Sequence, residues 1–555
     1  MTPFRQLVDL FWERFFWNDL ASPNSDSESS ISQTLGLLAV PGFFVSMYLI
    51  PRFMQLSFLT RPVVWDIRTY HLFFVAYSFA VVGFAALFQW DSLFPERRDF
   101  LIIAPLPVSM SRVFAAKLAA LGRFLLLIIV AVNAASTLLL PVFSLYVRQA
   151  HGAGVLRLML AHVVGVGAAA AFSFFAIAAI QGLLINLLSP RIFRTVSAWI
   201  QTLGMCAMIG SILLYPVYSQ GMKPIAVSRP ELLYLFPPFW FTGLYESMLP
   251  HPDAFVSQME SFAWKALTTS GALFALTYVA GYGRHYRRTM ESETTAGRRS
   301  YRGLPWAVRW LQSPQERAVY YFIGQTMARS LKHRLFLAVY LAVGLSIGVI
   351  GIATFRHDHG FVTASISREG LRALPLLITF FVLSGLRASF QFPMELASNW
   401  VFRTAESDWS EPARLAIRKR VLLSGLAVVL LLFVPLEIYV WGWRAGIFHT
   451  AFQLASGALL VEALFWTFDK IPFTCSYFPG AANLVILAGV YLYGFTSYGF
   501  KMASLEAILD DHPMRMILFF ASASVALAIL WRLRRVETAN SFDAEIPAFQ
   551  RLELN

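Results

Sequence analysis

The sequence predicts an all-α polytopic membrane protein with about twelve transmembrane helices arranged as two parallel six-helix repeats. Three observations carry this prediction. Hydrophobic residues make up 57% of the 555 residues and charged residues only 14%, whereas soluble domains carry about 25% charged residues. The mean hydropathy is +0.59. Apolar runs long enough to cross a bilayer recur along the chain, and in lipid such runs must be helical to satisfy their own backbone.

The N-terminal region, residues 1–30, predicts an amphipathic helix that lies in the membrane interface. Between residues 4 and 20, apolar side chains recur at helical spacing, with polar and charged side chains on the opposite face. The apolar face is rich in aromatic residues, which suits the headgroup region. Packing against another cytosolic element is the alternative. Acids and bases interrupt every apolar run here, so this is not a signal peptide.

The expected spans form two groups of six, separated by a polar segment. The first repeat, residues 31–283, and the second, residues 334–535, flank a basic cytosolic connector at 284–333, and a tail follows at 536–555. The spans expected in the first repeat are 34–50, 69–90, 118–146, 158–188, 193–216 and 262–282. Those expected in the second are 334–355, 372–391, 421–443, 446–468, 481–498 and 514–532.

Basic residues set the expected orientation. The connector holds many more Arg and Lys than acidic residues, and short basic loops stay in the cytosol. Counting spans outward from it places both termini in the cytosol. The net charge of +13 therefore indicates orientation and contact with lipid headgroups rather than nucleic acid. Arg52, Arg61 and Arg68 fall in an expected external loop, against this rule.

Two polar loops occupy matching positions between the second and third spans of the repeats. Each begins with a proline and an acid, continues with charged residues and ends at a basic start of the next span, near Lys117 or Lys419. Six spans per half is an even number, so the repeat is parallel rather than inverted. Recurrence at the same place favours a structural or contact role over a solvated connector.

The first loop resembles part of a known family. FPERRDFLIIAPLPVSMSRVFAAKL is similar to the cytosolic loop of permease subunits of type-2 ATP-binding-cassette exporters, and LFPPFWFTGLYE at 235–246 is similar to their external stretch. The N-terminal helix resembles their interfacial connecting helix. In the second half, FRTAESDWSEP replaces the LPLP turn, a departure from the first copy.

The resemblance implies a permease that exports a substrate between two six-span units of a bacterial cytoplasmic (inner) membrane protein. A separate ATPase subunit, in two copies, would bind ATP and Mg²⁺ and contact both cytosolic loops. In the first loop, the implied coupling residues are Pro95, Glu96, Arg97, Arg98, Asp99, Leu106 and Pro107. By internal repeat, those of the second loop are Glu395, Arg403, Glu406, Asp408 and Trp409.

Motifs for nucleotide binding or catalysis are absent from the sequence. It contains no G-x-x-x-x-G-K-[ST], H-E-x-x-H or C-x-x-C. The two cysteines, Cys206 and Cys475, form no disulfide framework or metal cluster. We therefore expect a protein that is not itself an enzyme and binds no metal or cofactor. Its expected partners are the ATPase and membrane lipids, with no nucleic acid.

Two carboxylates within expected spans indicate an intramembrane polar path. Glu437 falls in the ninth span and Glu462 in the tenth. Charge is costly in lipid, so such residues face the bundle interior, a cavity or a partner. A structural hydrogen bond or a protonated acid is the alternative. These acids keep an ion-coupled secondary transporter open as a second hypothesis.

A third hypothesis is a membrane-embedded transferase acting on lipid-linked sugar or acyl groups. Such an enzyme needs a polar cluster at one membrane face. The expected external loop 217–261 supplies candidate residues, namely Glu231, Glu246, His251, Asp253 and Glu260.

Overall fold

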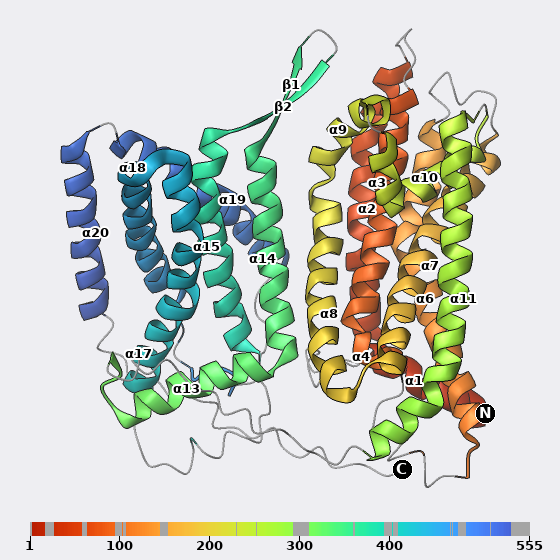
Figure 1. Cartoon of the computed structure of the whole chain (residues 1–555), viewed down its shortest axis with the longest axis horizontal. Coiled ribbons are helices and arrows are strands. Elements are labelled where there is room, and N and C mark those ends of the chain that lie inside the picture. The colour runs from red at the N-terminus through yellow and green to blue at the C-terminus, as the bar shows by residue number, and fades with distance from the viewer. Residues whose placement is uncertain are drawn as a thin grey trace. The chain divides into compact units, whose positions relative to one another are not determined.

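The computed structural model divides the chain into two compact units, Met1–Ala296 and Gly297–Asn555. Figure 1 identifies their elements by label and colour. The described residues are 3–16, 27–57, 64–94, 103, 107–144, 154–228, 230–250, 252–291, 310–358, 361–392, 402, 409–466, 468, 470–474, 484–510 and 512–533.

The first unit is a helical bundle around α3, which packs against α6, α7, α8 and α10. The segment expected as an external loop at 217–261 is largely helical, since α9, the 3₁₀ helix η2 and α10 occupy most of it. The elements are α1 (Pro3–Phe16), α2 (Ser27–Ser57), α3 (Val64–Phe88), α4 (Trp90–Leu93), α6 (Met110–Ser144), α7 (Val155–Leu187), α8 (Pro190–Leu213), α9 (Tyr215–Ser228), η2 (Pro230–Leu235), α10 (Pro237–Ser247) and α11 (Ala254–Glu291).

The second unit is built around α15, which packs against α14, α18 and α19. The short helix α13 lies across the ends of α14 and α17 (Figure 1). The elements are α13 (Pro314–Arg329), α14 (Leu331–Ile352), β1 (Ala353–Asp358), β2 (Phe361–Ile366), α15 (Arg368–Gln391), α17 (Ser410–Val421), the π-helical turn η4 (Leu422–Leu426), α18 (Ala427–Leu464), α19 (Leu484–Asp510) and α20 (Pro513–Leu533).

Eight helices in the described part of the chain are long and apolar enough to cross a membrane, which makes this an integral membrane protein. They are Trp65–Phe88, Ser111–Val142, Val155–Leu187, Thr195–Leu213, Leu331–Ile352, Arg368–Gln391, Glu411–Leu464 and Pro513–Leu533. One of these, Glu411–Leu464, contains the expected span 421–443 and residues 446–464 of the expected span 446–468. The expected spans 34–50 and 262–282 fall on α2 and α11, and residues 484–498 of the expected span 481–498 fall on α19.

A bend at Gly442 turns α18 into two antiparallel arms, residues 427–441 and 443–464. Gly442 has φ +82° and ψ 166°, a conformation essentially restricted to glycine. Close contacts follow on both sides of the bend: a Cβ on Gly446 would lie 3.0 Å from the backbone nitrogen of Ile438. This bend provides the turn between the ninth and tenth expected spans.

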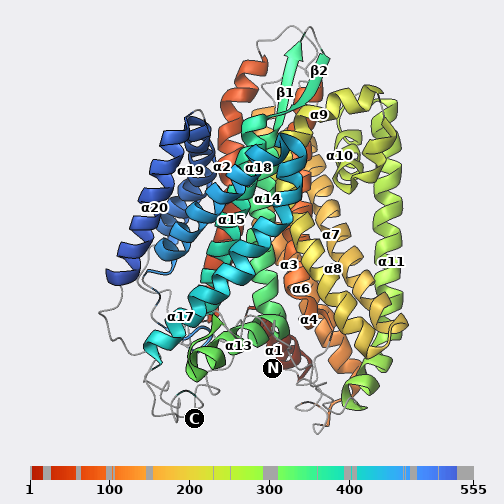
Figure 2. The same cartoon turned by 60° about the vertical axis from the view of Figure 1, so that its left-hand side comes forward.

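The expectation of an all-α chain misses one β-hairpin. β1 and β2 pair antiparallel, in register from Ala353 opposite Ile366 to Asp358 opposite Phe361. Both views show the strands extending beyond the end of α14 (Figures 1 and 2). The sequence of β2, FVTASI, is rich in β-branched and aromatic residues, which favour strands. A few such residues between two long apolar helices are easily taken for a loop.

Candidate functional site

Most of the predicted coupling residues lie outside the described part of the chain. The two that are described differ in exposure: Pro107 is exposed, whereas Trp409 is buried and its ring meets Phe402 edge-to-face at 5.2 Å. The structure does describe the helices on either side of both loops. The residues outside it are Pro95, Glu96, Arg97, Arg98, Asp99, Leu106, Glu395, Arg403, Glu406 and Asp408.

In the first unit, the aromatic face of α1 packs on the start of α6. Lys117 of α6 is only 2% exposed, and its Nζ lies 4.8 and 4.9 Å from the ring centroids of Phe11 and Phe15. Phe15 also stacks on Phe124 at 4.9 Å. Gln89, just before α4, donates a 2.7 Å hydrogen bond from Nε2 to the carbonyl of Phe15. Together these contacts hold α1 to both helices that border the first polar loop.

The opposite side of α1 carries a weaker contact. Asp9 pairs with Arg123 of α6 at 3.3 Å, and the Arg123 guanidinium lies 4.2 Å from the ring centroid of Trp12. Both charged side chains are well exposed. Exposed ion pairs of this kind contribute little stability, about 0–1 kcal/mol. The buried aromatic face, rather than this pair, fixes α1.

In the second unit, α13 packs on α17 through a buried ion pair that involves the last turn of α17. Ser313 caps α13 by accepting from the Glu316 N–H. Glu316 Oε2 in turn accepts from the N–H of Gln312, the residue before the cap, at 2.8 Å. Glu316 Oε1 lies 2.7 Å from Lys419 Nζ. Lys419 also donates to the Trp310 carbonyl at 2.6 Å.

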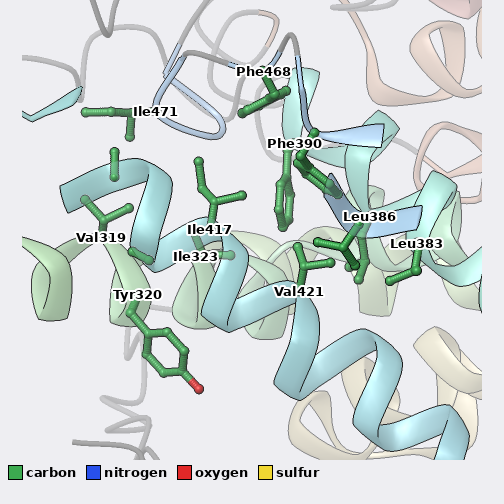
Figure 3. Close-up of a cluster of buried hydrophobic side chains, with 14 of the residues drawn as sticks. Val319, Tyr320, Ile323, Leu383, Leu386, Phe390, Ile417, Val421, Phe468 and Ile471 are labelled. Carbon is green, nitrogen blue, oxygen red and sulfur yellow. The ribbon is translucent and has the colours of Figure 1, made fainter. Parts of the chain in front are cut away.

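Apolar packing surrounds this ion pair. Figure 3 shows Ile323 of α13 beside Ile417 of α17. Arg420 lies over the Tyr320 ring at 5.1 Å, and a Cβ on Gly324 would lie 3.0 Å from the Arg420 guanidinium. A side chain at position 324 would therefore displace the Arg420 guanidinium from this contact. Further members of this cluster come from α13, α15, α17, η4, α18 and residues 465–473, together with Leu311, Phe402 and Trp409.

A buried acid–histidine cluster joins both arms of α18 to α19. Glu437, His449 and Glu506 are each at most 3% exposed. His449 Nδ1 lies 2.6 Å from the Glu506 carboxylate oxygens, and its Nε2 lies 3.7 Å from Glu437 Oε1, which is beyond hydrogen-bond reach. Glu437 instead contacts Thr450 Oγ1 at 2.9 Å and accepts from Gln453 Nε2 at 2.7 Å.

Sequence reasoning singled out Glu437 but missed His449 and Glu506. Glu506 lies beyond the expected span 481–498 because α19 continues to Asp510. His449 stands inside an apolar run, and an ionisable residue there is itself a signal of function. Reading ionisable residues along the whole of each helix would have found both.

Glu462, the other intramembrane carboxylate singled out, does not join this cluster. It pairs with Arg418 of α17 at 2.6 Å and is 3% exposed. Thr450 and Glu462 are separated by about 18 Å along the second arm of α18 at 1.5 Å per residue. The structure therefore places Glu437 and Glu462 at different depths and gives each its own partners.

At the other end of the first unit, Arg68 is held by two acids. Arg68 is 4% exposed and lies 2.6 Å from Glu246 and 3.0 Å from Asp253. His71 lies 3.2 Å from the same Glu246. The pairing neutralises Arg68, which explains why a basic residue stands in a loop expected to be external. Glu246 and Asp253, two of the acids considered for a transferase, are thus engaged in a structural contact.

The pKa of Asp253 is lowered by its neighbours. Burial alone would raise it, but the Val256 N–H, the Arg68 hydrogen bond and the Arg68 charge outweigh burial and hold the pKa of the Asp253 carboxyl below its usual range. The Val256 N–H donates to Asp253 Oδ1 at 2.8 Å. Asp253 thus begins α11 as an ionised cap and ties it to α3.

Comparison with protein-family models, curated proteins and solved structures gives no match for this chain. Within the described residues, no group of three or more His, Cys, Asp or Glu side chains is arranged to hold a metal ion. Function must therefore be inferred from the two buried lysine contacts and from the acid–histidine cluster.

Proposed function

We propose that the protein is the membrane-spanning permease subunit of an ATP-binding-cassette exporter, driven by ATP hydrolysis on a separate ATPase subunit present in two copies. The observation that carries the proposal is that Lys117 and Lys419 have matching positions and surroundings in the two units. Each stands in the first third of the long helix that follows a polar loop, either α6 or α17 continued by η4 and the first arm of α18, and each is buried beneath a short helix, α1 or α13. Two such contacts suit two identical ATPase subunits.

These contacts would transmit movement from the loops. A short helix fixed to the start of a long one moves with it as a rigid body, which is how domain motions are passed on in switching proteins. In the first unit, Lys117 contacts the rings of Phe11 and Phe15 of α1. In the second unit, Lys419 contacts the Glu316 carboxylate of α13. A displacement of either loop would therefore also displace α6 or α17.

We also propose two parallel six-helix repeats, which the packing of α3 and α15 supports. α3 and α15 are the most buried of the eight candidate spans. α3 packs against α7 and α8, and α15 packs against α18 and α19, with Phe452 of the second arm of α18 in one buried cluster with Leu377 of α15. On this assignment, twelve helices cross the membrane. They are α2, α3, α6, α7, α8 and α11, then α14, α15, α17 with the first arm of α18, the second arm, α19 and α20.

Orientation and location complete the proposal. The basic connector at 284–333 supports a cytosolic location for α13 and both termini, in a bacterial cytoplasmic membrane. α1 would lie in the inner interface with its aromatic face on α6 and its charged face toward water and lipid headgroups. ATP and Mg²⁺ would be bound by the ATPase.

Co-purification tests the proposal. Affinity-tagged protein extracted in mild detergent should carry an ATPase subunit with it. Charge reversal at Arg97 and Arg98 should abolish that association while membrane insertion stays normal, because these residues belong to the proposed coupling loop. Reversal of Arg52, an exposed residue of the expected external loop, is the matched control and should keep the ATPase. Purification alone together with transport in the absence of ATP would contradict the proposal.

An ion-coupled secondary transporter is the second candidate, favoured by the buried Glu437, His449 and Glu506 cluster. Such clusters are typical of proton relays in transporters. It predicts that substrate movement follows an imposed ion gradient in proteoliposomes without ATP. A Glu437→Gln, Glu462→Gln double variant should then lose gradient-driven transport, and normal transport by that variant would count against this candidate.

A further inference from the structure

The turn at residues 471–474 places Phe473 in a backbone conformation that favours glycine. Among the described residues, Phe473 is the one non-glycine residue with a positive φ, +67°. The Thr474 N–H donates to the Ile471 carbonyl at 3.4 Å. Pro472 fixes its own φ at about −65°, so this is a type II β-turn whose third position ordinarily takes Gly or Asn. A bulky side chain at such a position is a genuine outlier.

The Phe473 ring packs between three helices. It is 2% exposed and meets three other rings edge-to-face: His333 of α14 at 4.8 Å, Phe390 of α15 at 5.4 Å and Phe322 of α13 at 6.2 Å. A glycine at position 473 would suit the backbone but would provide none of these contacts. The ring contacts therefore offset an unfavourable backbone conformation, and strain of this kind persists only where the surrounding structure fixes it.

The same turn caps the end of α15. The Phe473 N–H donates to the Phe390 carbonyl at 3.0 Å. His333 Nε2 donates to the Phe392 carbonyl at 3.1 Å, since a carbonyl oxygen can only accept. Carbonyl groups at the end of a helix have no partner within that helix. The chain leaves α15 at Phe392 and enters the second polar loop, so these two contacts fix the point at which the loop begins.

A line of aromatic rings continues from Phe473 to the other end of the second polar loop. Phe322 meets Phe402 edge-to-face at 5.3 Å, and Phe402 meets Trp409 at 5.2 Å. Phe402 lies within the loop, Trp409 directly precedes α17, and both are buried. They belong to the same apolar cluster as Phe473, part of which Figure 3 shows around Phe390. One cluster therefore contacts both ends of this loop.

We propose that Phe473 is a positioning residue for the second polar loop. Its backbone N–H and its ring fix the end of α15 where the loop begins. Through Phe322, its ring also supports Phe402 and Trp409, where the loop returns to α17. The strained turn thereby sets the position at which the loop meets an ATPase subunit. Only this last step rests on the proposed permease function, because the contacts with α13, α14 and α15 need no partner.

Two substitutions at Phe473 separate the backbone strain from the ring contacts. Phe473→Gly removes both, whereas Phe473→Ala removes the ring and keeps the strain. We expect Phe473→Gly to have the higher thermal midpoint of the two, the reverse of the usual order at a negative φ. Both variants should nevertheless show faster amide hydrogen exchange in residues 386–392 and 413–416, because both lack the ring. If Phe473 contributed only stability, exchange would follow the midpoint instead.

Two further variants serve as controls. Phe452→Ala removes a buried ring from a different cluster of the same unit, where Phe452 stacks on Phe519 at 4.9 Å. It should lower the midpoint without faster exchange in either segment. Phe322→Leu interrupts the line of rings beyond Phe473 and leaves the turn unchanged. It should speed exchange in residues 413–416 but not in 386–392, and this result needs no folded Phe473 variant.

Co-purification connects Phe473 to the ATPase. Where wild type carries an ATPase subunit, both Phe473 variants should carry less of it and Phe452→Ala the wild-type amount. A wild type without an ATPase would contradict the proposed permease, and exchange alone would then decide whether Phe473 positions the loop.

Four results would overturn the inference about Phe473. They are a midpoint for Phe473→Ala at or above that of Phe473→Gly, exchange in the Phe473 variants no faster than in Phe452→Ala, unchanged exchange in Phe322→Leu, and wild-type ATPase recovery by the Phe473 variants.

Discussion

Lys419 Nζ lies 2.7 Å from Glu316 Oε1, with 11% and 1% of the two side chains exposed. Removing one partner of such a pair leaves a buried charge without its counterion, at a cost of about 3–5 kcal/mol. We expect Lys419→Met to lower the thermal midpoint of the second unit markedly.

A double-variant cycle measures this coupling. Lys419→Met with Glu316→Gln should be less destabilised than the sum of the single variants, because neither side chain then carries a buried charge. Arg414→Ala is the matched control, since its partner Glu411 is 61% exposed at 3.3 Å and such pairs contribute about 0–1 kcal/mol. Additive single-variant effects would show that the two residues do not interact.

Phe15 should fix α1 to α6. Phe15→Ala removes its contacts with Lys117 and Phe124, and buried Phe-to-Ala changes cost about 3–5 kcal/mol. We expect α1 to detach and the N-terminal segment to be cleaved faster in limited proteolysis. Phe4, which is 41% exposed, offers the control: Phe4→Ala should leave the cleavage rate unchanged. Equal rates for both variants would argue against a packed α1.

Gly442 should tolerate no side chain, for backbone reasons alone. A Cβ there would meet nothing within 4 Å, but φ is +82°, and a non-glycine residue in such a region costs about 1–3 kcal/mol. We expect Gly442→Ala to lower the thermal midpoint. A Cβ on Gly167 of α7 would also meet nothing within 4 Å, and Gly167 has no positive φ. Gly167→Ala should be neutral or slightly stabilising, and equal losses at both sites would contradict this account.

Asp253 should make the end of the first unit around Arg68 sensitive to acid. Its pKa is lowered in the folded protein, because the Val256 N–H and Arg68 outweigh burial. A depressed carboxyl pKa stabilises the fold above the ordinary value of about 3.9, and this stabilisation is lost as the pH falls through the folded-state pKa. Thermal midpoints measured from neutral pH downward should fall more steeply for wild type than for Asp253→Asn. Parallel curves would remove Asp253 as the source.

The sequence predicted the helical membrane class because hydropathy acts locally. Runs such as Val155–Leu187 and Leu331–Ile352 leave the backbone no alternative to a helix in lipid. Glu437 was found for the same reason, since a charge stands out in an apolar run. The packing of α1 on α6 appeared only as the alternative to a purely interfacial helix, because its amphipathic pattern fits both surroundings.

Contacts between residues far apart in the sequence could not be predicted from local hydropathy. No local pattern links Glu506 to His449 or Glu316 to Lys419, because these contacts depend on how the helices pack. The helix α13 was not predicted because its segment is rich in arginine and was interpreted as a basic connector, although Ser313 and Glu316 mark the start of a helix. The β-hairpin was missed because alternation over so few residues is weak beside a long apolar helix.

The π-helical turn at Leu422–Leu426 has a consequence for insertions and deletions. Such a turn contains one residue more than the α-helix needs, and each residue of an α-helix adds about 100° of rotation. Deleting one residue within the turn would restore a regular helix while rotating Lys419 relative to the first arm of α18. Either the contact with Glu316 or the contacts of Glu437 would then be lost, so both depend on this extra residue.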